Sequence, residues 1–277
     1  MAATISPLAS VHPDAQIADE VTIGPFCVIS SRAKIGFGTV LENNVTLMGD
    51  VTLGERNQIS PNAVLGGEPQ DISYGGTETK VVIGSHNIIR EGVTINRASE
   101  KEELVTRVGD GCFLMAYSHV AHDCHLEDNI IIANNVLLGG HVHLERNVIV
   151  SGSCAAHHFA TVGKYSFIGG LSAIRVDVPP YMLADGNPAK PYRANLIGLR
   201  RAGMDRRTIQ SISLMHKLYY VKKVQLEEAI KIVESEDLLT PEVEDIVQFL
   251  EFQASGANGR GSEGRRARKT QERKDVA

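Results

Sequence analysis

The dominant pattern along this chain is an aliphatic residue at every sixth position. One run extends from Val11 to Leu65, and the same spacing returns from Ile83 to Ile95. A third run, shifted by one position, extends from Val108 to Ile174 and includes the smaller Ala156. The apolar face of a helix repeats about every 3.6 residues and that of a half-buried strand every 2. A period of six therefore predicts very short strands joined by tight turns.

Glycine and other turn-forming residues reinforce this interpretation. Glycine follows the aliphatic residue in pairs such as Ile23-Gly24, Ile35-Gly36 and Val162-Gly163, where a chain that changes direction needs conformational freedom. Three such hexads form one triangular coil, whose aliphatic side chains point inward and stack on those of the next coil. Because each coil buries its apolar face only against its neighbours, the pattern predicts an all-β, three-sided solenoid.

Two polar stretches interrupt the period. Residues 66–82 and 98–107 are too long for corners and are predicted to be inserted loops. Insertions in a solenoid tend to lie on one face, which is often the binding face. The first loop carries Asp71, which makes it the stronger candidate for a functional role.

The pattern changes beyond Ile174. The sequence Val178-Pro179-Pro180 is predicted to end the stack, and helical patterns follow from about Asn195. Asp205 is a candidate cap for the first clear amphipathic helix, and Thr240-Pro241 has the form of another helix start. These features divide the chain into a β-helix over 1–190, a helical domain over 191–254 and a disordered basic tail over 255–277.

Charge and composition exclude several classes of protein. The net charge of −5 argues against a general nucleic-acid binder. Neither a signal peptide at the start nor an apolar run of about 18 residues is visible, so we expect no membrane span. Four cysteines without metal-site spacing are expected to be free thiols, as in a cytoplasmic protein.

Histidines provide the candidate chemistry. The spacing from His122 to His141, and from His141 to His157, is close to the three hexads of one coil, so all three fall near one edge of successive coils. The interpretations are polar corner residues, favoured for His125 and His143, a zinc site, or acid–base catalysis. The pair His122-Asp123 suits catalysis, because a carboxylate can orient a neutral imidazole that removes a hydroxyl proton. We therefore expect no metal and no cofactor.

Taken together, the motifs resemble those of the UDP-N-acetylglucosamine acyltransferases, hexapeptide-repeat enzymes that begin lipid A synthesis. The resemblance extends to about Phe252 and rests on a set of motifs: His119-Val120-Ala121-His122-Asp123-Cys124, Ile132-Ala133-Asn134-Asn135, Gly140-His141-Val142, His157-His158-Phe159, Asp177-Val178-Pro179-Pro180-Tyr181, Gly186-Asn187 and the segment from Asn195 to Arg201. It implies a left-handed parallel β-helix that assembles as a homotrimer with active sites between subunits. It also implies that the partners are acyl carrier protein and a UDP-sugar.

The same resemblance implies a role for each matching position. His122 would be the general base, Asp123 its partner and the Gly140 N–H the oxyanion donor. The expected substrate contacts are Asp71, His119, His141 and His157, with Asn195 and Arg201 on the nucleotide. Gly170 matches the position that limits acyl length, and a glycine there favours a long chain.

Several positions depart from the family pattern. The family's usual lysine two residues after the aspartate is Ser73, and its His-Arg-Gly-Thr is Asn96-Arg97-Ala98-Ser99. Its other departures are His158, Pro188 and Ala202. These changes affect substrate-binding groups and spare the base. Arg97 and Arg200 are candidates to supply the missing positive charge.

Three alternatives remain open from the sequence. The nearest is an acyltransferase of the same fold that uses another sugar nucleotide, with an amine acceptor or an acetyl-CoA donor. The second is a zinc hydratase of the same fold class. The third is a scaffold without catalysis, in which replacement of His122 would have no effect on any reaction.

Overall fold

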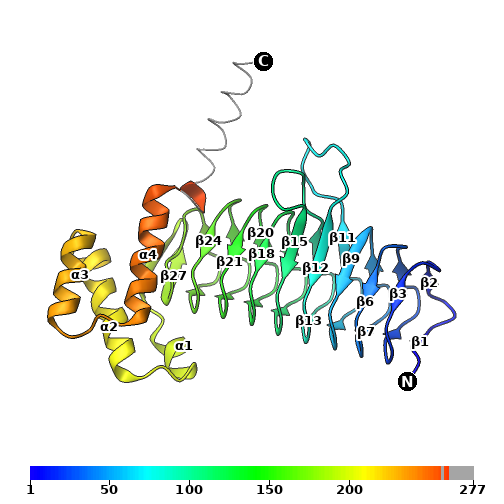
Figure 1. The fold of residues 1–277 in the computed structure, drawn as a ribbon, viewed down its shortest axis with the longest axis horizontal. Coiled ribbons are helices and arrows are strands. Elements are labelled where there is room, and N and C mark those ends of the chain that lie inside the picture. Colours follow the sequence, from blue (N-terminus) through cyan, green and yellow to red (C-terminus); the bar gives the residue numbers. More distant parts are fainter. Residues whose placement is uncertain (257–258, 262–277) are drawn as a thin grey trace, which may run out of the picture.

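The computed structural model describes residues 1–256 and 259–261, and its body is a three-sided parallel β-helix (Figure 1). Most strands contain two residues, of which the second is the buried aliphatic predicted by the period of six. Paired strands are separated along the chain by three hexads where no loop intervenes, as in Thr4 with Thr22. The predicted fold is therefore confirmed, and the period extends one strand further toward the N-terminus than expected, to β1.

The strands form three sheets, one on each side of the prism. Sheet A contains β1 (Thr4–Ile5), β4 (Thr22–Ile23), β7 (Val40–Leu41), β10 (Gln58–Ile59), β13 (Ile88–Ile89), β16 (Phe113–Leu114), β19 (Ile131–Ile132), β22 (Ile149–Val150), β25 (Phe167–Ile168), β27 (Met182–Gly186) and β28 (Ala189–Ala194). Sheet B contains β2 (Ser10–Val11), β5 (Val28–Ile29), β8 (Thr46–Leu47), β11 (Val64–Gly67), β14 (Thr94–Asn96), β17 (His119–Val120), β20 (Leu137–Leu138), β23 (Ala155–Ala156) and β26 (Ala173–Ile174). Sheet C contains β3 (Gln16–Ile17), β6 (Lys34–Ile35), β9 (Asp50–Leu53), β12 (Lys80–Ile83), β15 (Val105–Val108), β18 (His125–Leu126), β21 (His143–Leu144) and β24 (Thr161–Val162).

The corners require a left-handed backbone conformation. At successive corners between sheets B and C, φ is 60° at Asp123, 62° at His141 and 64° at Phe159. Such values are uncommon for residues other than glycine, asparagine and aspartate. The corner thus fixes where these three side chains lie, one above the next along the solenoid.

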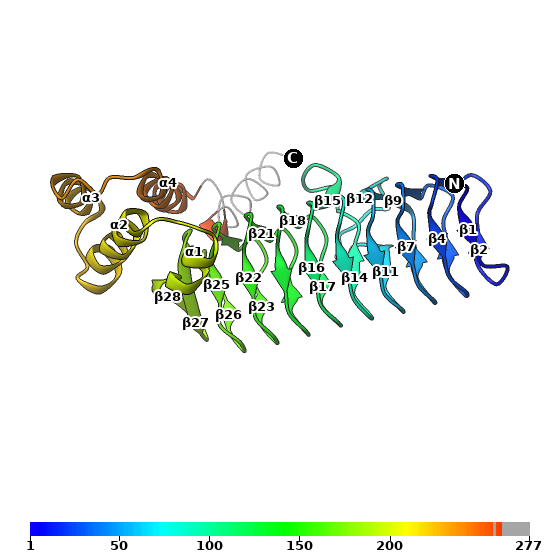
Figure 2. The ribbon, with the colours of Figure 1, turned by 90° about the horizontal axis from the view of Figure 1, so that it is seen from below.

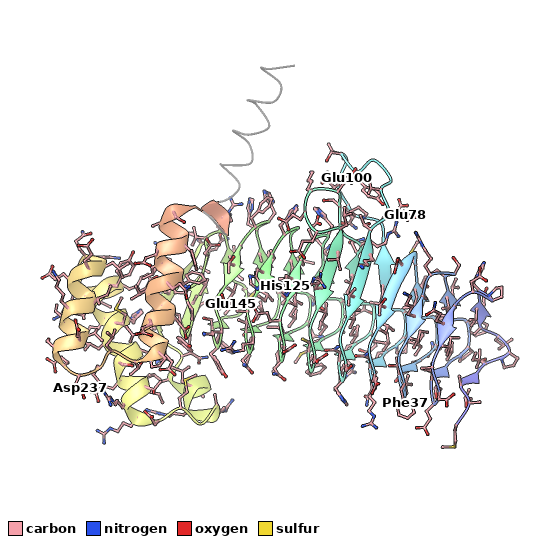
Figure 3. The ribbon with its side chains drawn as sticks, viewed as in Figure 1. Phe37, Glu78, Glu100, His125, Glu145 and Asp237 are labelled. Atoms are coloured by element: carbon pink, nitrogen blue, oxygen red, sulfur yellow. The ribbon has the colours of Figure 1, made fainter. Side chains whose placement is uncertain are left out.

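Both inserted loops leave the solenoid at the same B–C edge. The first joins β11 to β12, and the second joins β14 to β15. They project together from the body, with Glu78 on the first and Glu100 on the second (Figure 3). The bases of the loops are tied together, because the buried Arg97 donates from Nη1 to the Gly66 carbonyl at 2.7 Å and Asn96 donates to the Glu68 carbonyl at 2.6 Å.

Beyond Pro180 the chain forms a hairpin that the sequence pattern did not predict. Two further strands, β27 and β28, follow Pro180 and extend sheet A as an antiparallel hairpin, β27 pairing in parallel with β25. The hairpin could not be predicted from the repeat, because its strands do not keep the period of six and the two prolines before it are typical of the end of a stack. The regular coils therefore end before this hairpin, which extends to Ala194, and the boundary expected at residue 190 falls within β28.

The helices close the C-terminal end of the solenoid (Figures 1 and 2). Asp205 caps α2 (Arg206–His216) by accepting from the Thr208 N–H at 2.7 Å, as predicted. A π-helical turn (Lys217–Val221) follows, then α3 (Leu226–Ser235) and α4 (Pro241–Ser255), which starts with its proline in the first turn. The short α1 (Leu196–Arg201) was not separated from the helical pattern in the sequence.

Among residues 1–256 and 259–261, no helix has the length and apolar character needed to cross a bilayer. Most of the predicted disordered tail, at 257–258 and 262–277, lies outside the described residues. The expected free thiols are present as Cys27, Cys112, Cys124 and Cys154, all of them buried.

Candidate active site

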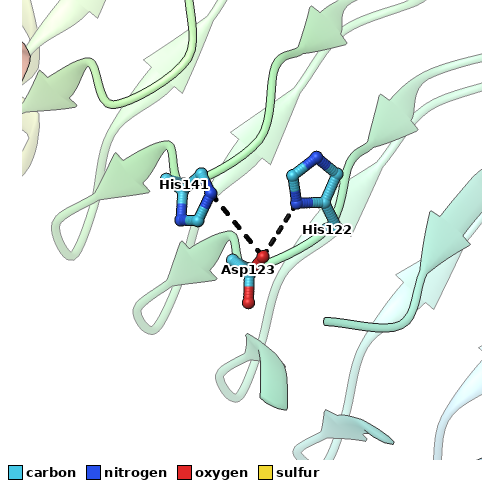
Figure 4. Close-up of side chains that lie close together, drawn as sticks. All are labelled: His122, Asp123 and His141. Carbon is cyan, nitrogen blue, oxygen red and sulfur yellow. Dashed lines mark hydrogen bonds and ion pairs between the residues drawn. The ribbon is translucent and has the colours of Figure 1, made fainter. Parts of the chain in front are cut away.

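The predicted base and its partner lie in the turn between β17 and β18. Asp123 occupies the left-handed corner position, which turns its carboxylate back toward the preceding residue. Nδ1 of His122 lies 2.8 Å from Asp123 Oδ2 (Figure 4). The imidazole side chain is 12% exposed and the carboxylate 1%, so the pair is sheltered but reachable from one side.

Asp123 is held by the second inserted loop. The backbone N–H of Ser99 lies 3.1 Å from both carboxylate oxygens, and the Ser99 hydroxyl donates to Oδ2 at 2.6 Å. Burial alone would raise the pKa of Asp123, but the hydrogen bonds from His122 and Ser99 outweigh it and the pKa lies below its ordinary value. The carboxylate is therefore ionised, and it favours the imidazole tautomer with its proton on Nδ1 and a free lone pair on Nε2.

The His122 ring lies directly over Gly140, one coil further along. A Cβ on Gly140 would lie 2.5 Å from Cε1 and 2.7 Å from Nε2 of that ring. Real Cβ atoms do not approach other atoms so closely, so the absence of a side chain at Gly140 lets the His122 ring keep its position against the next coil.

His141 lies behind the pair, in the next corner. Its ring stacks on Phe159 with centroids 4.3 Å apart, and its Nε2 lies 3.7 Å from Asp123 Oδ2. Glu102 Oε1 lies 3.2 Å from Nδ1 of His141, in a contact that is not aligned as a hydrogen bond. His141 therefore lies near the same Asp123 oxygen that His122 contacts, at a distance too long for a hydrogen bond.

His119 precedes this turn on β17 and projects outward from sheet B. Its Nδ1 lies 2.7 Å from the hydroxyl of Thr94 on the neighbouring strand. Burial lowers the pKa of His119, and the nearby His122 lowers it further. His119 is thus expected to be neutral near pH 7, able to offer or accept a hydrogen bond.

The two inserted loops meet through Asp71. Its Oδ1 accepts from the Ser73 N–H at 2.9 Å and from the Ser73 hydroxyl at 2.8 Å, and its Oδ2 accepts from Lys101 Nζ at 2.5 Å. The hydrogen bond from Lys101 is the largest cause, and those from Ser73 add to it; together they hold the pKa of the Asp71 carboxyl far below its ordinary value. Asp71 is therefore a permanently ionised group at the cleft.

These residues line one open cleft with a volume of about 780 Å³. The end nearest the loops is polar, with Gln70, Asp71, Lys101 and His119. Toward the helical domain the lining residues of sheet B are apolar (Leu137, Leu138, Ala155 and Ala156), while His141 and His158 line the corner beside them. His122 lies on the coil between the loop residues and these apolar positions, so the candidate base faces both a polar and an apolar region.

The other predicted site residues do not line this cleft within the single chain. Nδ1 of His157 faces Nη1 of Arg260 at 2.8 Å, while its neighbour His158 is part of the lining. Gly170 lies in a later corner, where an added Cβ would find only ordinary contacts, the nearest atom being 3.6 Å away. The sequence prediction therefore grouped these positions with residues of the cleft, whereas the single chain places them outside it.

The two predicted nucleotide contacts lie at α1. Asn195 is buried and caps this helix, accepting from the Gly198 N–H at 3.1 Å and donating to the Tyr165 carbonyl at 2.9 Å. Arg201 is the last residue of the same helix. Two histidines also differ from expectation: His125 and His143 lie in strands β18 and β21 rather than at corners, and their rings stack 4.8 Å apart.

Sequence reasoning missed several residues of the site. Ser99 holds Asp123, Lys101 pairs with Asp71, and Phe159 supports the His141 ring. Phe159 could have been found, because it occupies the position of His141 one coil of three hexads later. The loop residues could not, since the loops have no period from which their contacts could be predicted.

The zinc interpretation has one structural counterpart. Ligand atoms of His122, Asp123 and His141 lie within 4.8 Å of one another. The hydrogen bond between His122 and Asp123, together with those from Ser99, gives the same atoms a complete role in acid–base chemistry. This donor set therefore fits the catalytic interpretation without an ion.

Comparisons with known proteins show the family to which this chain is similar. Residues 177–261 match a family described as Udp N-acetylglucosamine O-acyltransferase, domain 2, and residues 32–67 and 106–140 match the bacterial transferase hexapeptide repeats. An acyl-[acyl-carrier-protein]–UDP-N-acetylglucosamine O-acyltransferase of Thermodesulfovibrio yellowstonii is 42% identical over 91% of this chain and 96% of its own length. The enzyme of the same name from Sinorhizobium fredii is 38% identical over 92% of this chain and 94% of its own length.

Solved structures give the same result. LpxA from Acinetobacter baumannii superposes with a TM-score of 0.85 at 39% identity, over 89% of this chain and 96% of the other. The Arabidopsis UDP-N-acetylglucosamine acyltransferase superposes with a TM-score of 0.77 at 33% identity, over 88% and 94%. The fold, the hexapeptide repeat and the sequence similarity over nearly the full length agree. The chain therefore belongs to the acyl-[acyl-carrier-protein]–UDP-N-acetylglucosamine O-acyltransferase family.

Proposed function

We propose that this protein transfers a 3-hydroxyacyl chain from acyl carrier protein to the glucosamine 3-hydroxyl of UDP-N-acetylglucosamine, the first step of lipid A synthesis. The observation that carries the proposal is the His122–Asp123 pair at the junction of a polar and an apolar region of one cleft. A sugar nucleotide suits the polar end, and a fatty acyl chain suits the apolar end. Names of relatives at 38–42% identity support the same two substrates.

The chemistry follows from the tautomer of the base. Nε2 of His122 removes the proton of the sugar hydroxyl as its oxygen attacks the thioester carbonyl carbon, and the carbonyl electron pair moves to the oxygen. The tetrahedral intermediate then collapses, the C–S bond breaks, and the imidazolium returns the proton to the departing sulfur. Ionised Asp123 stabilises the imidazolium between these two transfers.

Gly140 is the proposed donor to the developing oxyanion. Its backbone N–H lies at the corner beneath the His122 ring, and no acceptor among the described residues takes it. One such donor is typically worth about 3–4 kcal/mol of transition-state stabilisation. The remaining cleft groups, Asp71, His119 and His141, are proposed to contact the sugar, whereas His157, Asn195 and Arg201 are proposed to contact substrate across a subunit boundary.

The acyl chain is proposed to run along sheet B toward the helical domain. The outward residues Leu137, Ala155 and Ala173 follow one another in register on β20, β23 and β26. Gly170 lies in the A–B corner that leads into β26, and nothing in its surroundings requires a glycine. The absent side chain leaves space, which favours a long acyl chain.

We also propose a homotrimer with sites between subunits. Large apolar side chains occupy three left-handed corners of the A–B edge: Phe26 is 59% exposed, Tyr117 67% and Leu171 79%. Such residues are unfavourable both in that backbone conformation and in water, and burial against another copy would offset the second cost. The buried free thiols fit the cytoplasmic setting proposed for the reaction.

The direct test is turnover by the purified protein. UDP-N-acetylglucosamine and 3-hydroxyacyl carrier proteins of several lengths would be supplied, and the acylated nucleotide followed by mass spectrometry. His122→Ala is expected to lower kcat by at least about 10²-fold, because general-base catalysis typically contributes that much. His125→Ala, a histidine on the next strand outside the cleft, is the matched control and should keep wild-type activity.

Three outcomes would contradict the proposal. Full activity in His122→Ala would remove the assigned base. The second outcome is a wild type that gives no product from UDP-N-acetylglucosamine and acyl carrier protein but acylates an amino-sugar nucleotide, or uses acetyl-CoA as the donor. That result would favour the nearest alternative, another sugar-nucleotide acyltransferase of the same fold. Activity that follows zinc content would favour the hydratase.

A further inference from the structure

Lys101 is the only lysine or arginine among the described residues that line the cleft. It belongs to the second inserted loop, and its Nζ lies 2.5 Å from Oδ2 of Asp71 in the first loop. The Ser99 hydroxyl accepts from the Lys101 backbone N–H at 3.3 Å, so the same short segment also holds the catalytic Asp123. The ammonium is therefore placed relative to the base by a shared loop.

Burial separates the two members of this ion pair. The Asp71 side chain is 11% exposed and that of Lys101 47%, so the ammonium is the member that faces outward. Asp71 already accepts two hydrogen bonds from Ser73 on its other oxygen. An ammonium carries three donors, and Asp71 takes one of them, which leaves N–H groups for a ligand in the cleft.

The other cations proposed to supply positive charge are placed elsewhere. Arg97 is buried and bound to the Gly66 carbonyl, with Glu68 3.5 Å from its Nη2. Arg200 lies in the last turn of α1 and is not part of the lining. Ser73 occupies the position where the related enzymes usually carry lysine. Its side chain has only a hydroxyl group, which donates its hydrogen bond to Asp71.

We propose that Lys101 binds the diphosphate of the sugar-nucleotide acceptor and that Asp71 positions its ammonium. The positive charge thus comes from the second loop instead of the first. This inference rests on the proposed function only in taking a sugar nucleotide as the acceptor. It concerns binding of the acceptor, and the acyl donor reaches the cleft from the apolar end without this contact.

The experiment compares four proteins at one ionic strength: wild type, Lys101→Ala, the double variant Lys101→Ala with Ser73→Lys, and the control Lys34→Ala. Lys34 is an exposed lysine on β6, outside the cleft. Initial rates would give kcat and KM for UDP-N-acetylglucosamine and separately for the acyl carrier protein. Titration calorimetry would give the dissociation constants of UDP-N-acetylglucosamine and of uncharged N-acetylglucosamine without any turnover.

Lys101→Ala is expected to raise KM for the nucleotide sugar about 10- to 100-fold, the usual size of one charge-assisted hydrogen bond. The kcat, the KM for the carrier protein and the affinity for the uncharged sugar should stay within about twofold of wild type, since a lost phosphate contact affects none of them. The double variant should recover most of the lost affinity, because it returns a lysine to the same cleft from the first loop. Lys34→Ala should behave as wild type.

Three results would overturn the inference. One is an unchanged KM and dissociation constant for the nucleotide sugar in Lys101→Ala. The second is a raised KM for the carrier protein alone, which would assign Lys101 to the donor's phosphate. The third is a lower kcat with a lower unfolding temperature and unchanged binding, which would make the lysine a structural tie between loops. If wild type transfers no acyl group, the calorimetric comparison still decides the role of Lys101 while the proposed function fails.

Discussion

Single residues in this protein take their roles from the corner positions they occupy. Asp123, His141 and Phe159 share one left-handed corner on three successive coils, and each preceding residue (His122, Gly140 and His158) faces the cleft. The proposed base His122, Gly140 and the imidazole of His158 therefore follow one another at intervals of one coil. Their positions along the solenoid axis follow from their spacing of three hexads in the sequence.

Gly140 provides a sharp test at this scale. Gly140→Ala would place a methyl group 2.5 Å from Cε1 of His122 and displace the imidazole from its hydrogen bond with Asp123. We expect kcat to fall by about 10²-fold or more, because a displaced base loses its contribution to proton transfer. Initial rates and the unfolding temperature would be measured together.

The matched control is Gly152→Ala. Gly152 precedes the left-handed corner residue Ser153, but an added Cβ there meets its nearest atom at 3.5 Å. This variant should keep normal activity. Equal losses in both variants would mean that alanine disturbs the corners in general, and the assigned contact with His122 would be wrong.

The four cysteines show the same dependence on position. Each thiol points to a carbonyl on the neighbouring coil at a constant sequence separation, as in Cys27 to Glu42 and Cys124 to Gly139, at 2.8 and 3.2 Å. Thr39 makes the equivalent bond to Gly54 at 2.9 Å. Burial, chiefly, raises the pKa of Cys112 to about 11 and that of Cys124 to about 12, so these thiols are donors within the stack rather than nucleophiles.

At the scale of elements, α2 joins the helical domain to the solenoid. His216, near its end, is buried, stacks on Tyr220 with centroids 5.4 Å apart and has Nε2 3.4 Å from the Pro191 carbonyl of β28. Burial lowers the pKa of His216 below its ordinary value despite that carbonyl. The unfolded chain therefore binds a proton at this histidine more readily than the folded chain.

A pH dependence follows from that difference. The stability contributed by neutral His216 is complete above its unfolded pKa of about 6.5 and is lost as the pH falls toward the lower folded pKa. Between about pH 7.5 and 5.5, wild type should lose more unfolding free energy than His216→Phe, because phenylalanine does not titrate. Denaturant titrations at several pH values would measure the slope.

Tyr220→Phe is the comparison, because it keeps both His216 and the ring on which that histidine stacks. Its pH slope should match that of wild type. A slope for His216→Phe equal to that of wild type would show that this histidine does not couple protonation to the docking of α2.

At the scale of the whole molecule, the proposed trimer depends on the A–B edge. Tyr117→Glu places a charge at a 67% exposed corner of that edge and is expected to yield monomers and lose activity at micromolar concentration, because a buried unpaired charge is costly. Light scattering after gel filtration would give the mass. His86→Glu changes an exposed corner of the C–A edge and should leave assembly intact.

A monomeric wild type that is fully active would remove the trimer from the proposal. Monomers from both glutamate variants would instead place the interface on more than one edge. In either case, the cleft within one chain would have to accommodate both substrates without help from a second copy.

Sequence reasoning succeeded where the repeat carried the information. Leu126 and Leu144 could be assigned to the core from the spacing alone, and the His122–Asp123 pair followed from adjacency and from the family motif. It fell short where contacts join segments without a period. Nothing in the spacing indicated that Lys101 would meet Asp71, or that Asn195 would cap a helix, because loops and chain reversals obey local geometry rather than the repeat.

The constant length of one coil also has a consequence for descent by duplication and deletion. The coils that precede Gly66 contribute no residue to the cleft lining, so loss or gain of one whole coil there would alter the length of the molecule and leave every catalytic distance unchanged. The same event between Asp71 and Phe159 would shift the proposed site residues on one side of it by one strand spacing, about 4.8 Å, relative to those on the other side. If the proposed site is correct, we expect homologues to vary in length on the N-terminal side of the loops and to keep the same number of coils from the first loop to Phe159.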